Sequence, residues 1–227
     1  MEHTILIVGH RTGIGRSIAE LMLNSGHNVL GISREACYYN HENLTSFTCN
    51  IAEIDDSVIP ENLSGFVYCP GTINLKPFRS LKVQDFQNDF EINALGAASA
   101  LQKVERSIKS GKGSVILFST VAVGQGMPFH ASIAAAKGAV EGLTKSLAAE
   151  FAGKIRVNCI APTLTNTPLA EGILRNEEAI KRSDERHPSK RINSVDDVAN
   201  TAVFLLQNNN ITGQILHVDG GMSTLKV

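Results

Sequence analysis

A run of three glycines near the N-terminus constrains this chain more than any other feature. The apolar residues 5–8 predict a buried parallel strand, and Gly9, Gly13 and Gly15 lead from it into an amphipathic run that ends near Asn24. Glycines permit a tight turn and let the backbone approach a pyrophosphate, which the free N–H groups at the helix start would face. We interpret the stretch as a dinucleotide site. Its spacing differs from G-x-G-x-x-G, so a structural glycine turn stays open as the alternative.

Length and composition predict one α/β domain that covers residues 1–227. Hydrophobic residues make up 43% and charged residues 19%, which supplies a core on both sides of a sheet. The formal net charge of -1 offers no basic field to nucleic acid or to a membrane surface. We therefore expect the partners to be a small-molecule substrate and copies of the chain itself.

The cysteines and the N-terminal residues indicate a reducing compartment. Cys37, Cys49, Cys69 and Cys159 show no C-x-x-C spacing, and we expect them to be buried free thiols rather than disulfides or metal ligands. The N-terminus has no basic segment of a signal peptide, and no apolar stretch reaches 18 residues. We expect a cytoplasmic protein with no membrane span and no metal site.

Strand-like and helix-like segments alternate along the whole chain. This alternation predicts a Rossmann-type, doubly wound parallel sheet of about seven strands with helices on both faces. Residues 35–43 are too short and too polar for a crossover helix, so we expect a loop there. Residues 163–193 are rich in charge and turn residues and could form a lid over the site. The predicted strands are 5–8, 28–33, 44–49, 65–69, 114–119, 156–161 and 214–218, and the helices after the first are 83–109, 131–151, 170–184 and one from Ser194 to about Gln207.

The end of the second predicted strand favours NADP(H) over NAD(H). An acidic residue there would bind the adenosine ribose hydroxyls, whereas Ser33 leaves room for a 2′-phosphate and Arg34 supplies the opposite charge. A solvated arginine at a strand end is the alternative. We also place Arg11, Thr12 and Ile14, which lie among the glycines, in contact with the cofactor.

With these segments placed, nearly the whole chain resembles the compact, single-domain members of the short-chain dehydrogenase/reductase family. Gly9-x-x-x-Gly13-Ile14-Gly15 is similar to the family's cofactor loop, although Val8 stands where a threonine is usual. Residues 68–71 fall on its Asn-Asn-Ala-Gly segment, of which only the glycine is kept. Thr163 replaces a usual glycine in the stretch that lies against the nicotinamide. The further cofactor-binding residues that the resemblance implies are Asn50, Ile51, Cys69, Pro70, Gly71, Lys137, Pro162, Leu164 and Thr167.

The catalytic residues of this family are Asn, Ser, Tyr and Lys, and the chain departs from that set. Asn93 and Lys137 match the family's helix Asn and active-site Lys, and Thr120 stands for the Ser and keeps a hydroxyl. Ile133 occupies the Tyr position, four residues before Lys137. The spacing matters because Tyr and Lys at i and i+4 share a helix face, where the ammonium favours the phenolate. Isoleucine can neither ionise nor donate, and none of Tyr38, Tyr39 and Tyr68 lies where it could substitute.

Two routes could supply the missing proton. His130 lies three residues before Ile133, and an unperturbed histidine with a pKa of about 6.5 is a competent general acid. In the alternative, His130 only lines its loop, and water relayed through Asn93 and Lys137 gives the proton.

Two functions from different classes follow from these residues. Asn93, Thr120 and Lys137 favour an NADP(H)-dependent oxidoreductase that acts on a small carbonyl or alcohol. Ile133 and the altered residues 68–70 favour a catalytically silent nucleotide-binding protein, a sensor or scaffold on the same fold. In either case we expect a homodimer or homotetramer built through residues 83–109 and 131–151. The second of these segments carries small residues at three- and four-residue steps, namely Ala135, Gly138, Ala139 and Gly142.

Overall fold

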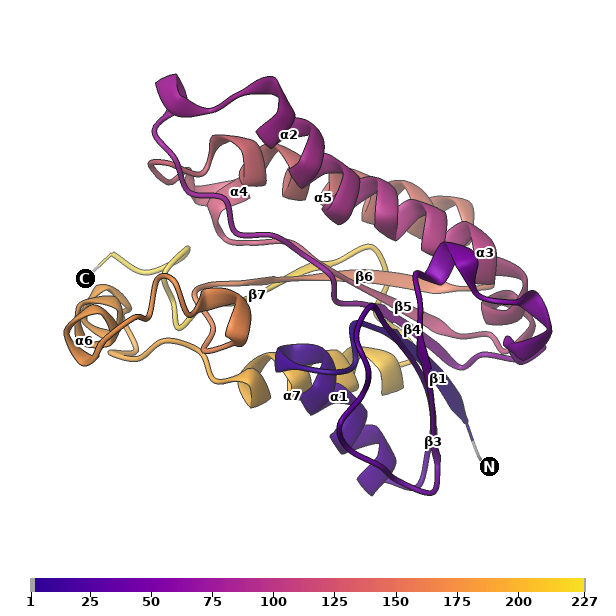
Figure 1. Cartoon of the computed structure of the whole chain (residues 1–227). Coiled ribbons are helices and arrows are strands. Elements are labelled where there is room, and N and C mark those ends of the chain that lie inside the picture. The colour runs from indigo at the N-terminus through magenta and orange to yellow at the C-terminus, as the bar shows by residue number, and fades with distance from the viewer. Residues whose placement is uncertain (1–2, 227) are drawn as a thin grey trace.

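Seven parallel strands form one sheet in the order β3-β2-β1-β4-β5-β6-β7 in the computed structural model, which describes residues 3–226 (Figure 1). All six strand pairs are parallel. The chain order reverses between β1 and β4, the position at which ligands bind in sheets of this kind. The predicted fold class is confirmed. The strands are β1 Thr4–Val8, β2 Asn28–Ser33, β3 Leu44–Thr48, β4 Gly65–Tyr68, β5 Ser114–Phe118, β6 Arg156–Pro162 and β7 Ile215–Val218.

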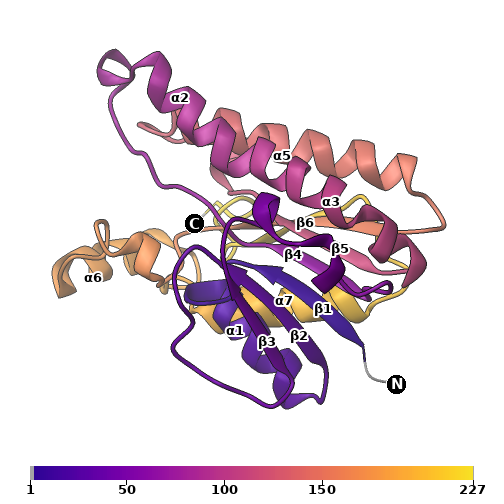
Figure 2. The same ribbon diagram turned by 45° about the vertical axis from the view of Figure 1, so that its right-hand side comes forward.

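Helices cover both faces of the sheet (Figures 1 and 2). On one face lie α1 Gly13–Asn24 and α7 Val195–Gln207; on the other lie α2 Val83–Phe90, α3 Gly96–Ser110 and α5 Ala131–Glu150. Side chains of β1 alternate between two buried clusters, with Ile5 and Ile7 on the α1 and α7 side and Leu6 and Val8 on the α3 and α5 side. Both faces of the sheet are therefore buried from water, and this explains the unbroken apolar runs of the central strands.

The element boundaries agree with the sequence to within two residues, except in two helices. The loop expected at residues 35–43 is confirmed. The helix expected at 170–184 is wrong at its start, because α6 runs from Glu177 to Arg186 and only a 3-10 turn, Pro168–Ala170, precedes it. The Asn176 side chain accepts from the Ala179 N–H, and two acids follow in the first turn, so the helix begins there. The short helix α4, Ala122–Gln125, was not expected.

The long helix predicted at 83–109 is interrupted. A π-helical turn, Glu91–Leu95, separates α2 from α3. Two side-chain hydrogen bonds involve this turn. Tyr68 Oη donates to the carbonyl of Ile92 in the turn at 2.8 Å, and Asn93 Nδ2 donates back to the Asp89 carbonyl in α2 at 2.7 Å. Single π turns inside helices are frequent at functional sites, and this one carries the predicted catalytic Asn93.

The cysteine prediction is only partly confirmed. All four thiols are free, but Cys159 alone is buried, and the other three residues are half-buried. Within residues 3–226 no three or more His, Cys, Asp or Glu side chains group in a way that could bind a metal ion. Of the helices described, none combines the length and apolarity that crossing a membrane would require.

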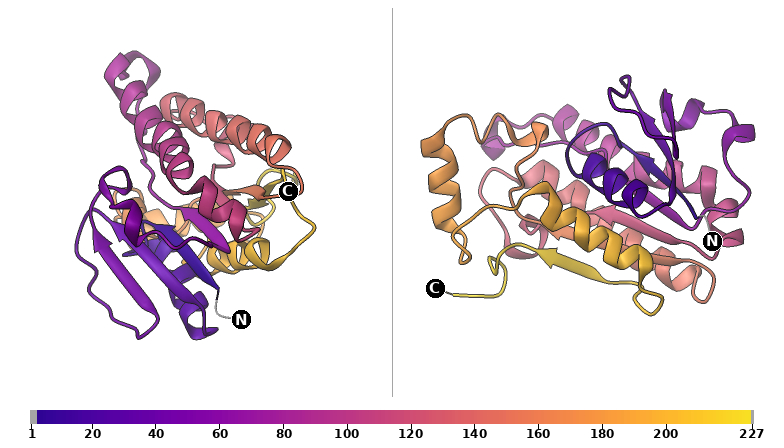
Figure 3. Two further views of the ribbon diagram at one scale, coloured as in Figure 1. Left: turned by 90° about the vertical axis from the view of Figure 1, so that its right-hand side faces the viewer. Right: turned by 90° about the horizontal axis from the view of Figure 1, so that it is seen from below.

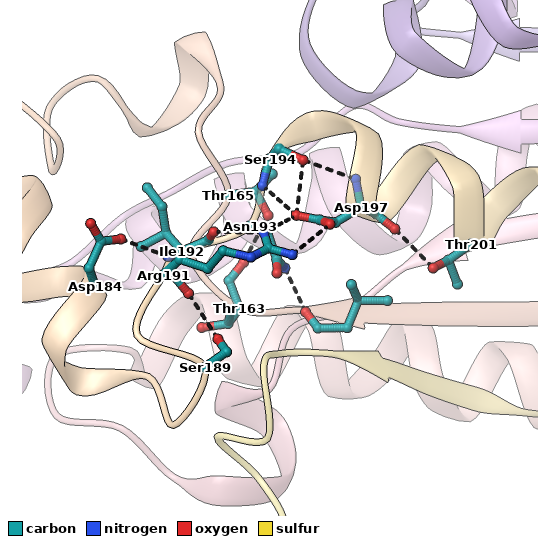
Figure 4. Close-up of polar contacts among 11 residues, drawn as sticks. Thr163, Thr165, Asp184, Ser189, Arg191, Ile192, Asn193, Ser194, Asp197 and Thr201 are labelled. Atoms are coloured by element: carbon teal, nitrogen blue, oxygen red, sulfur yellow. Dashed lines mark hydrogen bonds and ion pairs between the residues drawn. The ribbon is translucent and has the colours of Figure 1, made fainter.

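The segment between β6 and α7 projects beyond the carboxyl ends of the strands (Figure 3). Its last residues are bonded to the chain that follows β7, because Ser189 N–H donates to the Gly220 carbonyl and Asn193 Nδ2 to the Val218 carbonyl. Arg191 forms a two-pronged ion pair with Asp197 in the first turn of α7 (Figure 4). The expected lid is thus held firmly at its base.

Candidate cofactor site and active site

A cavity of about 550 Å³ opens at the carboxyl edge of the sheet, beside the reversal of strand order between β1 and β4. It brings together most of the predicted cofactor residues: Gly9, Arg11, Thr12, Gly13, Ile14, Gly15, Ser33, Arg34, Asn50, Ile51, Cys69, Pro70, Gly71 and Thr167. The other residues that line it were not among the predicted site residues, and they come mainly from strand ends, the π turn and the start of the expected lid. These are Val8, Glu35, Cys49, Ala52, Tyr68, Glu91, Ile92, Leu95, Gly96, Ser99, Pro168 and Leu169.

The glycine loop has the geometry that a pyrophosphate needs. Gly9 and Gly13 adopt φ of +85° and +56°, which favour glycine, and a Cβ on Gly15 would come within 2.3 Å of the Gly9 carbonyl oxygen. The Thr12 side chain does not cap α1, and the first turn of α1 carries no acid. The N–H groups and the positive end of this helix are therefore available to an anion, so the loop fits a dinucleotide.

The far end of the cavity carries two arginines. Arg34 is exposed and lines the cavity, while Arg11 pairs with Glu35 at 2.9 Å and donates to the Ala36 carbonyl at 3.0 Å. Ser33 Oγ donates to the Glu35 carbonyl at 2.7 Å, which fixes the turn after β2. Both guanidinium groups thus border the region where the sequence predicts a 2′-phosphate.

An aromatic brace behind the glycine loop was missed by sequence reasoning. Tyr39 Oη donates to the His10 carbonyl at 3.1 Å, and the Arg16 guanidinium lies over the rings of Tyr38 and Tyr39. Burial raises the pKa of Tyr39 and lowers that of His10, whose Nε2 bonds to Ser46 Oγ at 2.9 Å. These contacts bind the loop at residues 35–43 to the glycine loop and so shape the far end of the cavity. The adjacent aromatic residues Tyr38 and Tyr39 in an otherwise polar loop were the sequence signal that could have predicted these contacts.

Asn93 and Lys137 both lie close to Gly71 in the cavity wall. Asn93 Oδ1 lies 3.3 Å and Lys137 Nζ 3.5 Å from the point that a Cβ on Gly71 would occupy. Lys137 is 8% exposed, and its Nζ donates to the Phe118 carbonyl at 2.8 Å. Burial lowers the pKa of Lys137 to about 8, against the opposing effect of Cys159, Cys69 and Asp89. The ammonium is therefore close to titration at neutral pH.

The structure offers no tyrosine to Lys137 within the described residues. Ile133 is 5% exposed and lies one turn before Lys137 on α5. Tyr68 uses its hydroxyl on the Ile92 carbonyl, and burial raises the pKa of this phenol to about 12. Tyr38 and Tyr39 lie in the aromatic brace at the other end of the cavity.

Six predicted site residues do not line the cavity itself: Asn93, Thr120, His130, Lys137, Pro162 and Leu164. Thr120 follows β5, and its Oγ1 accepts from the Ala122 N–H at 3.3 Å. The Pro162 and Leu164 carbonyls accept from the N–H groups of Val121 and Asn193. His130 immediately precedes α5, and its Nδ1 lies 2.8 Å from the Pro128 carbonyl oxygen. A carbonyl only accepts, so Nδ1 carries the proton, and Nε2 of the neutral ring can only accept.

Thr163, which replaces a usual family glycine, fastens the segment after β6. Its Oγ1 lies 2.9 Å from Nε2 of His187, a residue only 1% exposed, and Nδ1 of that ring bonds to the Ser183 carbonyl at 2.7 Å. The C-terminal end of α6 is thereby linked to the end of β6.

The sheet order, the glycine loop and the cavity define a Rossmann-type dinucleotide-binding protein. A family profile described as Enoyl-(Acyl carrier protein) reductase matches residues 8–223. The chain therefore belongs to the short-chain dehydrogenase/reductase family of NAD(P)-dependent oxidoreductases that act on CH–OH groups.

Individual relatives agree over almost the full length. The chain is 30% identical over 244 residues to a 2,5-dichloro-2,5-cyclohexadiene-1,4-diol dehydrogenase of Sphingobium indicum, covering 98% of this chain and 97% of the relative. It is 32% identical over 241 residues to a 2-dehydro-3-deoxy-D-gluconate 5-dehydrogenase of Bacillus subtilis, covering 96% and 93%. The solved structure of ElxO with NADP bound superposes with a TM-score of 0.88 at 26% identity, covering 99% of this chain and all of that one.

Proposed function

We propose that this protein is an NADP(H)-dependent oxidoreductase that transfers hydride to or from a small carbonyl or alcohol with an atypical proton source. The observation that carries the proposal is that Asn93 Oδ1 and Lys137 Nζ both lie beside Gly71, at the wall of a cavity that fits a dinucleotide. When bound, the nicotinamide supplies the hydride. The side chains that remain for the chain to use are a buried ammonium, an amide and the Thr120 hydroxyl.

The choice of NADP(H) rests on charge at the far end of the cavity. Arg34 and Arg11 border it, and Ser33 leaves space where an acid would repel a 2′-phosphate. The bound NADP in ElxO supports the same choice by similarity. Glu35 neutralises part of this charge through its pair with Arg11, so Arg34 is the principal contact that we propose for the phosphate.

For the proton we favour the route through Asn93 and Lys137. Both groups lie within 3.5 Å of one point on the cavity wall, and Lys137 has a pKa of about 8, so it can exchange a proton near neutrality. His130 lies outside the cavity lining, and its Nε2 donates only when the ring is cationic. Lys137 also has the binding role that the family resemblance implies, on the nicotinamide ribose.

A silent binding protein is the second candidate, and Ile133 is the observation that favours it. The experiment that separates the two incubates the protein with NADPH and a panel of aldehydes, ketones and cyclic diones, and follows the loss of NADPH absorbance. Turnover on any member supports the oxidoreductase. Tight NADPH binding in a thermal-shift titration without turnover on the whole panel supports the silent protein instead.

A homo-oligomer and a reducing, cytoplasmic setting complete the proposal. Phe90 on α2 is 42% exposed although it is a large apolar residue, which supports a partner surface on the outer side of the helix pair. The four free thiols support a reducing compartment.

A further inference from the structure

A buried carboxyl group lies on α2, one helical turn before Asn93. Asp89 is 2% exposed, and its Oδ2 is one of five buried side-chain nitrogen or oxygen atoms in residues 3–226 that have no hydrogen-bond partner. Two of the others, Asn93 Oδ1 and Ser132 Oγ, belong to the π turn and to α5, which pack against α2 (Figure 2). Burial of unpartnered polar atoms costs free energy, so their concentration here calls for a role beyond packing.

The side chains of Asp89, Thr72 and Asn93 form a line of hydrogen bonds, which we call the polar chain. Thr72 Oγ1 donates to Asp89 Oδ1 at 2.7 Å, and Asn93 Nδ2 donates to Thr72 Oγ1 at 2.9 Å. A carboxylate can only accept, so the Thr72 hydroxyl must give its proton to Asp89 and must offer a lone pair to Asn93. The carboxylate thus sets the direction of the polar chain. The Asn93 amide is held by two bonds of its Nδ2 group, one to Thr72 Oγ1 and one to the Asp89 backbone carbonyl.

In this orientation Asn93 presents its oxygen to the active site. Asn93 Oδ1 and Lys137 Nζ flank the same point beside Gly71. Asn93 Oδ1 has no hydrogen-bond partner within the described residues and is free to accept. If the amide turned over, its NH₂ group would stand in place of this oxygen, and Asn93 would offer no acceptor on the side of the ammonium. With Ile133 in place of a tyrosine, the proposed proton route depends on this one arrangement.

We propose that Asp89 is a positioning residue for proton transfer: through Thr72 it holds Asn93 Oδ1 toward Lys137, and its charge stabilises the buried ammonium. This inference rests on the proposed carbonyl chemistry at the same site. The neighbours that favour the charged form of Lys137 are Cys159 on β6, Cys69 after β4, and Asp89. Burial raises the pKa of both thiols to about 12, so they are neutral at pH 7, and Asp89 is the carboxyl group among the three.

Asp89→Asn keeps the shape of the side chain and removes its charge. An amide at this position can donate to Thr72 Oγ1, so the hydroxyl no longer has to offer a lone pair to Asn93. The Asn93 Nδ2 group then keeps only its bond to the backbone carbonyl of residue 89 and is held less firmly. We expect kcat to fall about tenfold while the Kd for NADPH stays within about twofold. The alkaline limb of the kcat profile should move to lower pH by about half a unit, because Lys137 loses a negative neighbour.

Two NMR measurements on the protein without substrate or cofactor test the same proposal independently of turnover. The Lys137 ammonium, followed through a label on its ε-carbon, should titrate at lower pH in Asp89→Asn. The Asn93 side-chain amide proton that is bonded to Thr72 should exchange with solvent about tenfold faster in Asp89→Asn and in Thr72→Val, because the polar chain protects it. The other proton is bonded to the backbone carbonyl of residue 89, which both variants keep. Thr72→Ser keeps the hydroxyl and should retain the protection.

Asp85→Asn is the matched control, since it removes a carboxylate from the same helix one turn earlier. Asp85 pairs with Lys76 at 2.7 Å and accepts from the Lys82 N–H, and it has no hydrogen bond to the polar chain, so neither NMR readout should change. Wild-type amide exchange and wild-type Lys137 titration in Asp89→Asn would overturn the proposal. Failure of the wild type to reduce any carbonyl would overturn the proposed function instead, and the NMR readouts would still decide the role of Asp89. If Asp89→Asn unfolds, amide exchange in Thr72→Val tests the polar chain while Asp89 is kept.

Discussion

Ile133 is 5% exposed on the buried side of α5, one turn before Lys137. An isoleucine packs there but cannot exchange a proton, so in the proposed function the acid–base work falls to groups that keep a titratable or polar atom. Lys137 and Asn93 lie on the same side of Gly71, and Thr120 lies after the adjacent strand β5. We propose that an ammonium takes the part that the family resemblance assigns to a phenol.

The first prediction at this scale concerns Arg34. A charge-assisted hydrogen bond from arginine to a phosphate contributes about 1.5–3 kcal/mol, so the wild type should bind NADPH more tightly than NADH by roughly ten- to a hundredfold. Arg34→Ala should remove most of that preference and leave NADH binding within about twofold. Thermal-shift titrations with both cofactors measure this. Arg106→Ala, an exposed arginine on α3, is the control. Equal stabilisation of the wild type by the two cofactors would contradict the assignment.

The second prediction separates the two proton routes by their pH dependence. Burial lowers the pKa of Lys137 to about 8, so the ammonium is lost as pH rises through that value, and kcat of the wild type should fall above about pH 8. His130→Ala should keep this limb and change kcat less than about threefold. The kcat profiles of both proteins between about pH 5 and 10 give the answer. A loss of tenfold or more, with disappearance of a transition near the histidine pKa of about 6.5, would assign the proton to His130.

At the scale of helices and strands, the sequence predicted most of the architecture because its patterns are local. Continuous apolar runs identified the central strands, and the capping pattern at Ser194 located the start of α7, where both hydrogen bonds of a capping box are present. The π turn could not be predicted in this way. Apolar residues at helical spacing predicted one continuous helix over 83–109, yet Val83 and Phe90 are 74% and 42% exposed, while the polar Asp89 is buried.

The site was predictable to a similar extent. The glycine loop follows from a motif between a strand and a helix, and Ser33 and Arg34 follow from their place at the end of the second predicted strand; these residues line the cavity. Thr72 and Asp89 were missed because their importance comes from contacts across distant parts of the chain: a loop after β4 and one turn of α2 meet only in the folded protein. An acid four residues before Asn93 was the only signal, and by itself it reads as a solvated helix residue.

The third prediction concerns the start of α7, where Asp197 holds the base of the expected lid (Figure 4). Its carboxylate accepts from the Ser194 N–H and pairs with both terminal nitrogens of Arg191. Loss of a helix cap and an ion pair costs about 1–2 kcal/mol, so Asp197→Asn should lower Tm by roughly 2–8 °C. Calorimetry or circular dichroism at pH 7 measures the change.

The pH dependence of this effect has a definite sign. The Arg191 guanidinium holds the pKa of Asp197 well below its usual range, so the carboxylate adds stability above its unfolded pKa of about 3.9. The advantage of the wild type over Asp197→Asn should shrink as pH falls below about 4. Arg191→Lys keeps the positive charge but loses the two-pronged guanidinium contact, so its loss of stability should be smaller than that of Arg191→Gln. Additive effects of Asp197→Asn and Arg191→Gln in a double-mutant cycle would contradict the direct pairing.

Across the whole molecule, the two faces of the sheet differ in what covers them. α1 and α7 cover one face, and the longer α3 and α5, extended by α2, cover the other (Figures 1 and 3). The small residues of α5 do not all pack inward: Ala135 and Gly142 are exposed, and a Cβ on Gly142 would meet no atom within 4 Å. A flat strip of this kind suits an isologous contact between two copies, because it lets two helices approach closely.

The last prediction uses that open space at Gly142. If a second copy packs on α5, a large charged side chain there should clash with the partner, although the isolated chain has room for it and arginine is the better helix former. Light scattering of the wild type at micromolar concentration should give a dimer or tetramer, and Gly142→Arg should give a smaller species with unchanged or higher helix content. Gly172→Arg is the matched control, because Gly172 is equally open but lies in the turn before α6. A monomeric wild type would contradict the proposed oligomer. A Gly142→Arg protein with the same oligomeric mass as the wild type would show that the interface does not lie on this side of α5.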